Sequence, residues 1–184
     1  MRILIADDES IIRLGVRSML QKLGHEVVAT GGGQEAIAEA KRIKFDMAIL
    51  DIKMPGTDGL SAAKAIYKQQ PMPIVFLTAF SDAQLIDEAT ELPIAGYLVK
   101  PVLEGELAAA IAMARKGFGA RQELQEEADQ LRTRLAQRQI VDRAKGKLME
   151  QGFTEEEAYQ QIQSIARAKQ VTMAQVAQVI LKQS

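Results

Sequence analysis

Carboxylates end two apolar runs in the first half of the sequence. Asp7 and Asp8 follow the first run, and Asp51 ends the run that begins at Met47. An unbroken apolar run of this length is typical of a strand buried on both faces, as in a parallel sheet covered by helices. Asp51 would therefore lie at the carboxyl end of a central strand, where open α/β sheets place their ligand sites. Taken alone, this residue could equally cap a turn, because proline and glycine follow it.

Two further polar residues, Thr78 and Lys100, also stand at the ends of apolar runs. Three carboxylates in one cleft repel one another unless a cation lies among them, and hard oxygen ligands suit Mg²⁺. Lys100 would offset the remaining negative charge, and the Thr78 hydroxyl would contact a phosphoryl oxygen. Such groups supply the positioning and charge neutralisation that phosphoryl transfer requires. We therefore predict that Asp51 is a nucleophile that forms an aspartyl phosphate.

Strand and helix patterns alternate over roughly the first 115 residues, a length typical of one domain. We expect strands at residues 2–6, 25–30, 46–51, 73–78 and 94–99, and helices at residues 10–23, 34–43, 58–70, 81–91 and 103–116. Right-handed crossovers between these strands predict an α/β fold with a doubly wound, five-stranded parallel sheet. The carboxyl ends of parallel strands meet at one edge, which would bring the polar side chains together.

Residues 1–118 resemble the receiver domain of two-component response regulators. The resemblance is carried by Asp7-Asp8, Asp51-x-x-Met-Pro55 with Gly59, Thr78-Ala79, and Tyr97-x-x-Lys100-Pro101. It implies a flavodoxin-like sheet with strand order 2-1-3-4-5 and a sensor histidine kinase as phosphodonor. The ligands of Mg²⁺ would be Asp8, Asp51 and the backbone carbonyl of Lys53, with Asp7 assisting. Thr78 and Tyr97 would form a switch pair; the alternative for Tyr97 is a half-buried aromatic residue at the sheet edge.

One enzyme class shares this chemistry. A haloacid-dehalogenase-like phosphatase also uses an aspartate nucleophile on a doubly wound sheet, but it needs a second acid two residues later to protonate the leaving group. Here that position is Lys53. We therefore expect no dedicated enzyme: the receiver would catalyse only the phosphorylation of its own Asp51 and the slow loss of that group.

The overall composition is that of an ordinary globular protein, with 47% hydrophobic residues, 26% charged residues and a net charge of −1. The absence of cysteine excludes disulfides and thiolate metal sites. The first apolar run is too short for a signal peptide, and no stretch reaches transmembrane length. These features predict a cytoplasmic protein without a membrane partner.

A linker helix with a short coiled-coil seam is expected at residues 119–137, after a flexible or helix-bending point at Gly117 and Gly119. Apolar residues in this helix follow the a/d spacing of a coiled coil, with steps of four, three and four; they are Leu124, Ala128, Leu131 and Leu135. This seam predicts a homodimer in the active form. The alternative is one long helix that packs on its own receiver.

Residues 138–184 are expected to form an all-α bundle of three helices, because a capping box at Thr154–Glu157 and a cap at Thr172 start two further helices. The segment resembles the ANTAR domain, an RNA-binding module of transcription antitermination regulators. The motifs are Arg138-x-Ile-Val-x-x-Ala144-Lys145-Gly146-x-Leu148-Met149, Glu157-Ala158-Tyr159 and Val176-Ala177. The sequence departs from that family at Gln163, where a basic residue is common. The resemblance implies binding of RNA stem-loops.

Basic side chains are concentrated in residues 131–149, which hold six Lys and Arg residues against one acid. Such a segment indicates a polyanionic partner. The candidate RNA contacts are Arg134, Arg138, Arg143, Lys145 and Lys147. Phe153 and Tyr159 are both expected in the core, so phosphate and shape recognition should dominate over base stacking. Two alternatives are a DNA-binding helix-turn-helix, disfavoured by an acid-rich second helix, and a purely structural dimerisation tail.

Overall fold

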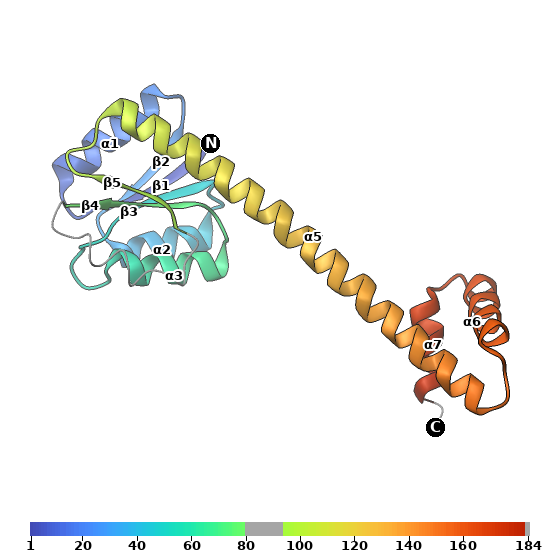
Figure 1. Cartoon of the computed structure of the whole chain (residues 1–184). Coiled ribbons are helices and arrows are strands. Elements are labelled where there is room, and N and C mark those ends of the chain that lie inside the picture. Colours follow the sequence, from blue (N-terminus) through green and yellow to red (C-terminus); the bar gives the residue numbers. More distant parts are fainter. Residues whose placement is uncertain (80–93, 183–184) are drawn as a thin grey trace. The chain divides into compact units, whose positions relative to one another are not determined.

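The computed structural model describes residues 1–79 and 94–182 of the chain (Figure 1). The helix expected at residues 81–91 lies outside this part. The chain folds into two compact units, Met1–Gln122 and Glu123–Ser184.

The first unit contains the predicted parallel sheet. The strands of the described residues are β1 (Arg2–Ala6), β2 (Glu26–Thr30), β3 (Met47–Asp51), β4 (Ile74–Thr78) and β5 (Ile94–Val99). Their order is β2-β1-β3-β4-β5, which confirms the predicted fold class. Every residue of β3 and β4 is buried, because both strands have neighbours on each side and helices above and below.

Helices cover both faces of this sheet (Figure 1). Among the described residues of the first unit, the helices are α1 (Ser10–Lys22), α2 (Gly33–Arg42), α3 (Gly59–Gln69) and the first turns of α5 (Glu104–Glu150). Ile3 and Ile5 of β1 pack with α1 and the start of α5. Leu4 and Ala6 pack with α2 and α3 on the opposite face. This alternation of side chains along a strand gives the sheet two cores and leaves its carboxyl edge for polar groups.

Helix α5 continues through Gly117 and Gly119 without interruption. The expected end of this helix at Lys116 is therefore wrong. A glycine in a helix costs about 1 kcal/mol relative to alanine, and the neighbouring alanine, arginine, glutamate and leucine residues are strong helix formers. Among the described residues, no helix is long and apolar enough to cross a membrane.

The second unit packs the end of α5 against α6 (Glu155–Lys169) and α7 (Met173–Lys182). The buried apolar residues described in this unit are Ala144, Leu148, Ala158, Ile162, Ala166, Ala174, Val176 and Ala177. Gly152, with a φ of +99°, ends α5 in a conformation that favours glycine. The capping box predicted for α6 is confirmed: the Thr154 and Glu157 side chains each accept from the other residue's backbone N–H.

Candidate functional site

An acidic cleft lies at the carboxyl edge of the sheet. Asp51 ends β3 and Asp7 follows β1, and both are buried, whereas Asp8 is exposed. One carboxylate oxygen from each of the three lies within 4.8 Å of those of the other two. The structure thus brings these candidate residues together because their strands are adjacent and parallel.

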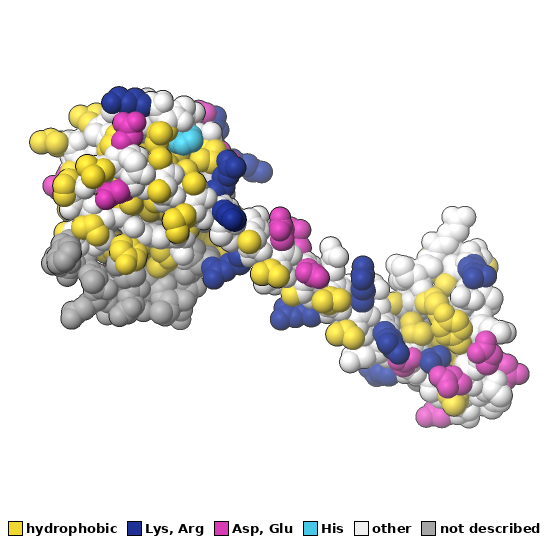
Figure 2. Space-filling model, turned by 45° about the horizontal axis from the view of Figure 1, so that its top comes forward, with side chains coloured by type: hydrophobic (Ala, Val, Ile, Leu, Met, Phe, Trp, Pro, Cys, Tyr) yellow, Lys and Arg dark blue, Asp and Glu magenta, His cyan; other side chains and the backbone are white. Residues whose placement is uncertain are grey.

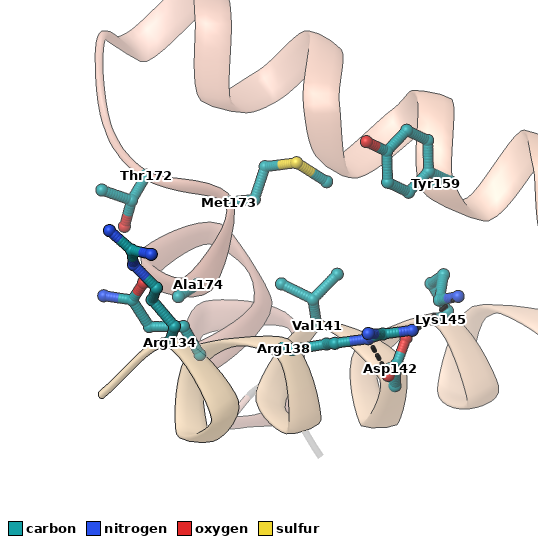
Figure 3. A pocket seen from close by; sticks show the side chains of 10 residues that line it. Arg134, Arg138, Val141, Asp142, Lys145, Tyr159, Thr172, Met173 and Ala174 are labelled. Atoms are coloured by element: carbon teal, nitrogen blue, oxygen red, sulfur yellow. Dashed lines mark ion pairs between the residues drawn. The ribbon is translucent and has the colours of Figure 1, made fainter. Parts of the chain in front are cut away.

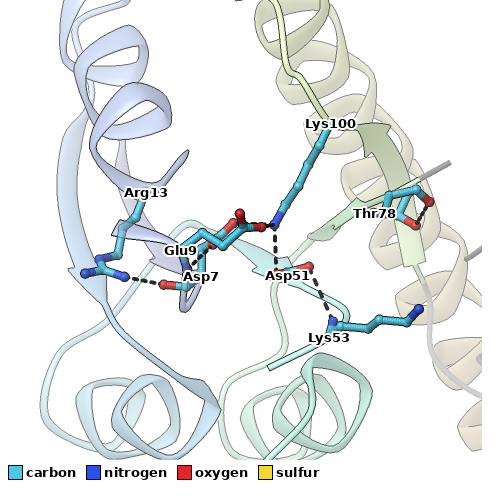
Figure 4. Close-up of polar contacts among 8 residues, drawn as sticks. Asp7, Glu9, Arg13, Asp51, Lys53, Thr78 and Lys100 are labelled. Atoms are coloured by element: carbon cyan, nitrogen blue, oxygen red, sulfur yellow. Dashed lines mark hydrogen bonds and ion pairs between the residues drawn. The ribbon is translucent and has the colours of Figure 1, made fainter. Parts of the chain in front are cut away.

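Lys100 holds three carboxylates of this cleft with one ammonium group (Figure 4). Its Nζ lies 2.8 Å from Asp51 Oδ2, 3.0 Å from Asp7 Oδ2 and 3.1 Å from Glu9 Oε1. The Lys100 side chain is only 11% exposed. Burial alone would lower its pKa, but the three hydrogen-bonded carboxylates outweigh burial and raise it, so the ammonium stays charged.

Burial affects the pKa of Asp51, the phosphoacceptor candidate, more than the hydrogen bond from Lys100 does. It raises the pKa of Asp51, and the hydrogen bond from Lys100 opposes this shift only in part. The Asp51 carboxylate also accepts a hydrogen bond from the backbone N–H of Lys53, at 3.3 Å. Both of its oxygens are therefore fixed, Oδ2 by an ammonium and Oδ1 by the backbone.

Gly59, the first residue of α3, packs directly against the end of β3. Its N–H donates to the carbonyl of Ile52 at 2.9 Å. A Cβ at Gly59 would overlap the carbonyl oxygen of Asp51. Only glycine permits this approach, which fixes the loop after β3.

The two switch candidates lie on neighbouring strands. Thr78 ends β4, is buried, and its Oγ1 donates to the carbonyl of Ala79 at 2.9 Å. Tyr97 lies on β5, paired with Phe76 of β4, and its side chain is largely exposed.

Two residues that sequence reasoning missed complete the cleft. Glu9 is the N-cap residue of α1, and its carboxylate reaches Lys100. Arg13 lies one turn later on α1, and its Nη1 donates to the carbonyl of Asp7 (Figure 4). The available signal was the position of Glu9 directly after the acidic pair, with Arg13 four residues further along a predicted helix.

The acidic cleft offers a donor set that fits Mg²⁺. Asp7, Asp8 and Asp51 provide carboxylate oxygens, the ligands this hard cation prefers. Asp8 and Lys53 line one hollow of about 520 Å³ beside the cleft.

A second, basic hollow lies in the C-terminal unit, between α5, α6 and the start of α7 (Figure 3). Its volume is about 450 Å³. Its lining residues are Arg134, Gln137, Arg138, Val141, Asp142, Lys145, Tyr159, Thr172, Met173 and Ala174. Three of the five predicted RNA contacts thus share this hollow: Arg134, Arg138 and Lys145.

The basic candidates differ in how firmly they are held. Lys145 lies 2.9 Å from Glu155 and 3.0 Å from Asp142, and its side chain is 16% exposed. These two carboxylates raise its pKa, Glu155 more than Asp142. Lys147 donates to the carbonyl of Ile180 at 2.9 Å, which joins α5 to α7. Arg143 is exposed.

The expectation that Phe153 and Tyr159 are core residues is wrong. Tyr159 is 40% exposed and Phe153 is 37% exposed. The core of this unit is formed by alanine, valine, leucine and isoleucine side chains. The aromatic rings are therefore left at its surface.

The predicted seam residues form an apolar row at the surface of α5. Leu124, Leu131 and Leu135 are exposed, with Leu131 at 51%, and Ala128 is partly exposed. Figure 2 shows hydrophobic side chains at the surface of this helix.

Comparison with known proteins supports the architecture. Residues 3–112 match the response regulator receiver domain, and residues 129–181 match the ANTAR domain. The transcriptional regulatory protein PdtaR of Mycobacterium tuberculosis is 42% identical over 183 residues, 98% of this chain and 89% of PdtaR. The transcriptional regulatory protein LnrK of Bacillus subtilis is 36% identical over 119 residues, 63% of this chain and 54% of LnrK.

Solved structures agree for the first unit. The chemotaxis protein CheY4 of Vibrio cholerae has a TM-score of 0.59 and 33% identity, and the match covers 61% of this chain and 97% of CheY4. The receiver match spans more than half of the sequence, and PdtaR matches nearly all of it. The domains are those of a regulator rather than a dedicated enzyme. The chain belongs to the response regulators, with an N-terminal receiver domain and a C-terminal ANTAR domain.

Proposed function

We propose that this protein is a cytoplasmic response regulator that is activated by phosphorylation of Asp51 and then binds RNA stem-loops to promote transcription antitermination. The observation that carries the proposal is the buried Asp51 carboxylate, fixed by Lys100 within a cluster of acids. The ANTAR match and the basic hollow of the second unit support the RNA-binding half.

The phosphodonor would be a sensor histidine kinase. An Asp51 oxygen attacks the phosphorus of a phosphohistidine, the new P–O bond forms as the P–N bond breaks, and the imidazole leaves. Asp7, Asp8, Asp51 and the Lys53 carbonyl would hold Mg²⁺, which would supply charge neutralisation at the phosphoryl oxygens. Lys100 contributes a second positive charge from the protein itself.

The conformational response would follow from the added charge of the phosphoryl group on Asp51. The Thr78 hydroxyl stands at the end of the adjacent strand and would donate to the phosphoryl group instead of to Ala79. Tyr97, exposed on β5, would move inward into the space that Thr78 leaves. The exposed leucine row of α5 would then join two copies as a homodimer, which doubles the basic surface offered to RNA.

One experiment tests both halves. The full-length protein is treated with acetyl phosphate and Mg²⁺, and the labelled product is titrated against a two-hairpin leader RNA. We expect an acid-stable, base-labile label on the parent, none on Asp51→Asn, and tighter RNA binding by the labelled form. Persistent labelling of Asp51→Asn would overturn the phosphoacceptor assignment. Absence of nucleic-acid binding by every form would favour a dimerisation tail, and preference for duplex DNA would favour a DNA-binding regulator.

A further inference from the structure

Tyr159 presents an aromatic ring to a cationic hollow. It lies on α6 and is 40% exposed, although eight apolar residues described in the same unit are buried. Val141 points from α5 towards Met173 and Tyr159 (Figure 3). The ring therefore stands at the edge of a partly apolar hollow rather than on a fully solvated helix face.

The hollow combines two kinds of surface. Val141, Met173 and Ala174 give it an apolar floor, whereas Arg134 and Arg138 are exposed at its rim. A surface that recognises only the phosphates of a duplex needs cations and gains nothing from an apolar floor. An unpaired base has a flat apolar face and carries its phosphates alongside, so it matches both surfaces at once.

We propose that this hollow binds one unpaired nucleobase of the RNA, with the Tyr159 ring as the stacking platform. The inference rests on the proposed RNA-binding function and adds to it the chemical group that is read. Arg134 and Arg138 contact the phosphates that flank the base. The stacked base covers the apolar floor and removes Tyr159 from water.

The remaining polar groups keep the hollow in shape. Lys145 is held by Asp142 and Glu155, so it lines the wall as a fixed charge. Thr172 accepts from the N–H of Gln175 and donates to its side chain, which fixes the start of α7. The stacking site is thus built by the folded helices before RNA arrives, which lowers the entropic cost of binding.

Affinity measurements on matched variants test this proposal. The probes are an RNA hairpin with 2-aminopurine in its loop and a loop-free duplex of the same stem. The variants of the full chain are Tyr159→Phe, Tyr159→Leu and Tyr159→Ala. Phe153→Ala is the matched control, because Phe153 is 37% exposed in the same unit but does not line the hollow.

Stacking of one base is worth ~1–3 kcal/mol by alanine substitution. We therefore expect Tyr159→Ala to weaken hairpin binding by about 5- to 150-fold, whereas Tyr159→Phe and Phe153→Ala stay within about twofold. The duplex should bind all forms equally. At saturation, 2-aminopurine fluorescence should be quenched by the parent and by Tyr159→Phe but not by Tyr159→Leu, which keeps apolar bulk without a ring.

The outcomes distinguish failure of the Tyr159 stacking site from failure of the proposed RNA-binding function. Equal hairpin affinity and equal quenching for the parent, Tyr159→Leu and Tyr159→Ala would overturn the stacking site and leave RNA binding intact. No binding of either RNA by the parent would overturn the proposed function itself. Circular dichroism of each variant confirms that the helices are retained.

Discussion

Lys145 Nζ and Glu155 Oε1 lie 2.9 Å apart, so a basic residue of α5 is bound by the first residue of α6. Asp142 holds the same ammonium from one turn earlier on α5. An RNA phosphate that approaches Lys145 must therefore compete with two carboxylates. Under the proposed RNA-binding function, these acids would therefore help to set the affinity of the ANTAR domain for RNA.

Glu155→Gln should strengthen RNA binding, because it releases Lys145 for a phosphate contact. We expect a steeper dependence of the logarithm of affinity on the logarithm of salt concentration, by roughly 0.7–0.9 for one added phosphate contact. Glu156→Gln is the control, since Glu156 accepts from Gln160 and has no ion pair with Lys145. Equal effects of the two variants would show that only net charge matters.

Gly59→Ala should damage the phosphorylation site through the backbone. The added methyl group would overlap the Asp51 carbonyl, and such overpacking costs about 1–3 kcal/mol. We expect a lower free energy of unfolding in urea and slower labelling by acetyl phosphate. Gly15→Ala is the control: it lies within α1, nothing is within 4 Å of its new methyl group, and it should be neutral or stabilising. Normal labelling of Gly59→Ala would mean that the loop after β3 can shift without moving Asp51.

Lys100→Met should make the stability of the receiver depend on divalent cations. Without the ammonium, Asp7, Glu9 and Asp51 lose the cation that pairs with all three, at a cost of roughly 1–3 kcal/mol. Mg²⁺ should restore part of this loss by binding the folded state. Thermal unfolding with EDTA and with Mg²⁺ measures the effect. The exposed Lys22, 3.8 Å from Glu104, provides the control substitution Lys22→Met. If both variants respond to Mg²⁺ as the parent does, Lys100 is not needed to balance the cleft.

Leu131→Glu should give monomers if the leucine row of α5 is the dimer seam, because it places a charge at the centre of an apolar contact. Gln130→Glu adds the same charge beside the row and should leave the dimer unchanged. Sedimentation of the phosphorylated protein at micromolar concentration distinguishes the two. A Leu131→Glu variant that sediments like the phosphorylated parent would place the dimer contact elsewhere.

Much of the fold could be predicted because buried parallel strands carry an unbroken apolar pattern. The strand expected at residues 46–51 is observed as Met47–Asp51, and that expected at residues 94–99 agrees at both ends. Helix ends were harder, because they depend on a balance of small energies. Glycine is a poor helix former, so Gly117 and Gly119 suggested a helix end, but the surrounding residues keep α5 continuous.

The residues of the polar cleft that stand at strand ends could be predicted from the sequence, whereas those at the start of α1 could not. Asp51 and Lys100 each end an apolar run, which places them at the sheet edge. The contacts of Glu9 and Arg13 depend instead on the direction in which their side chains leave α1, which residue types alone do not determine. Tyr159 was placed in the core because aromatic residues usually lie there, but aliphatic side chains form the core of this bundle and Tyr159 is 40% exposed.

The three carboxylates paired with Lys100 are translated well before their cation. Lys100 contacts Asp51 across 49 residues and Glu9 across 91 residues. A nascent chain that ends before β5 therefore carries the acids without their ammonium, while β4 still lacks its outer neighbour. Contacts between such distant residues form late, because closing long loops is entropically costly. Under the proposed function, competence to receive a phosphoryl group would thus arise only when the last strand is made, so an unfinished polypeptide would not respond to the signal.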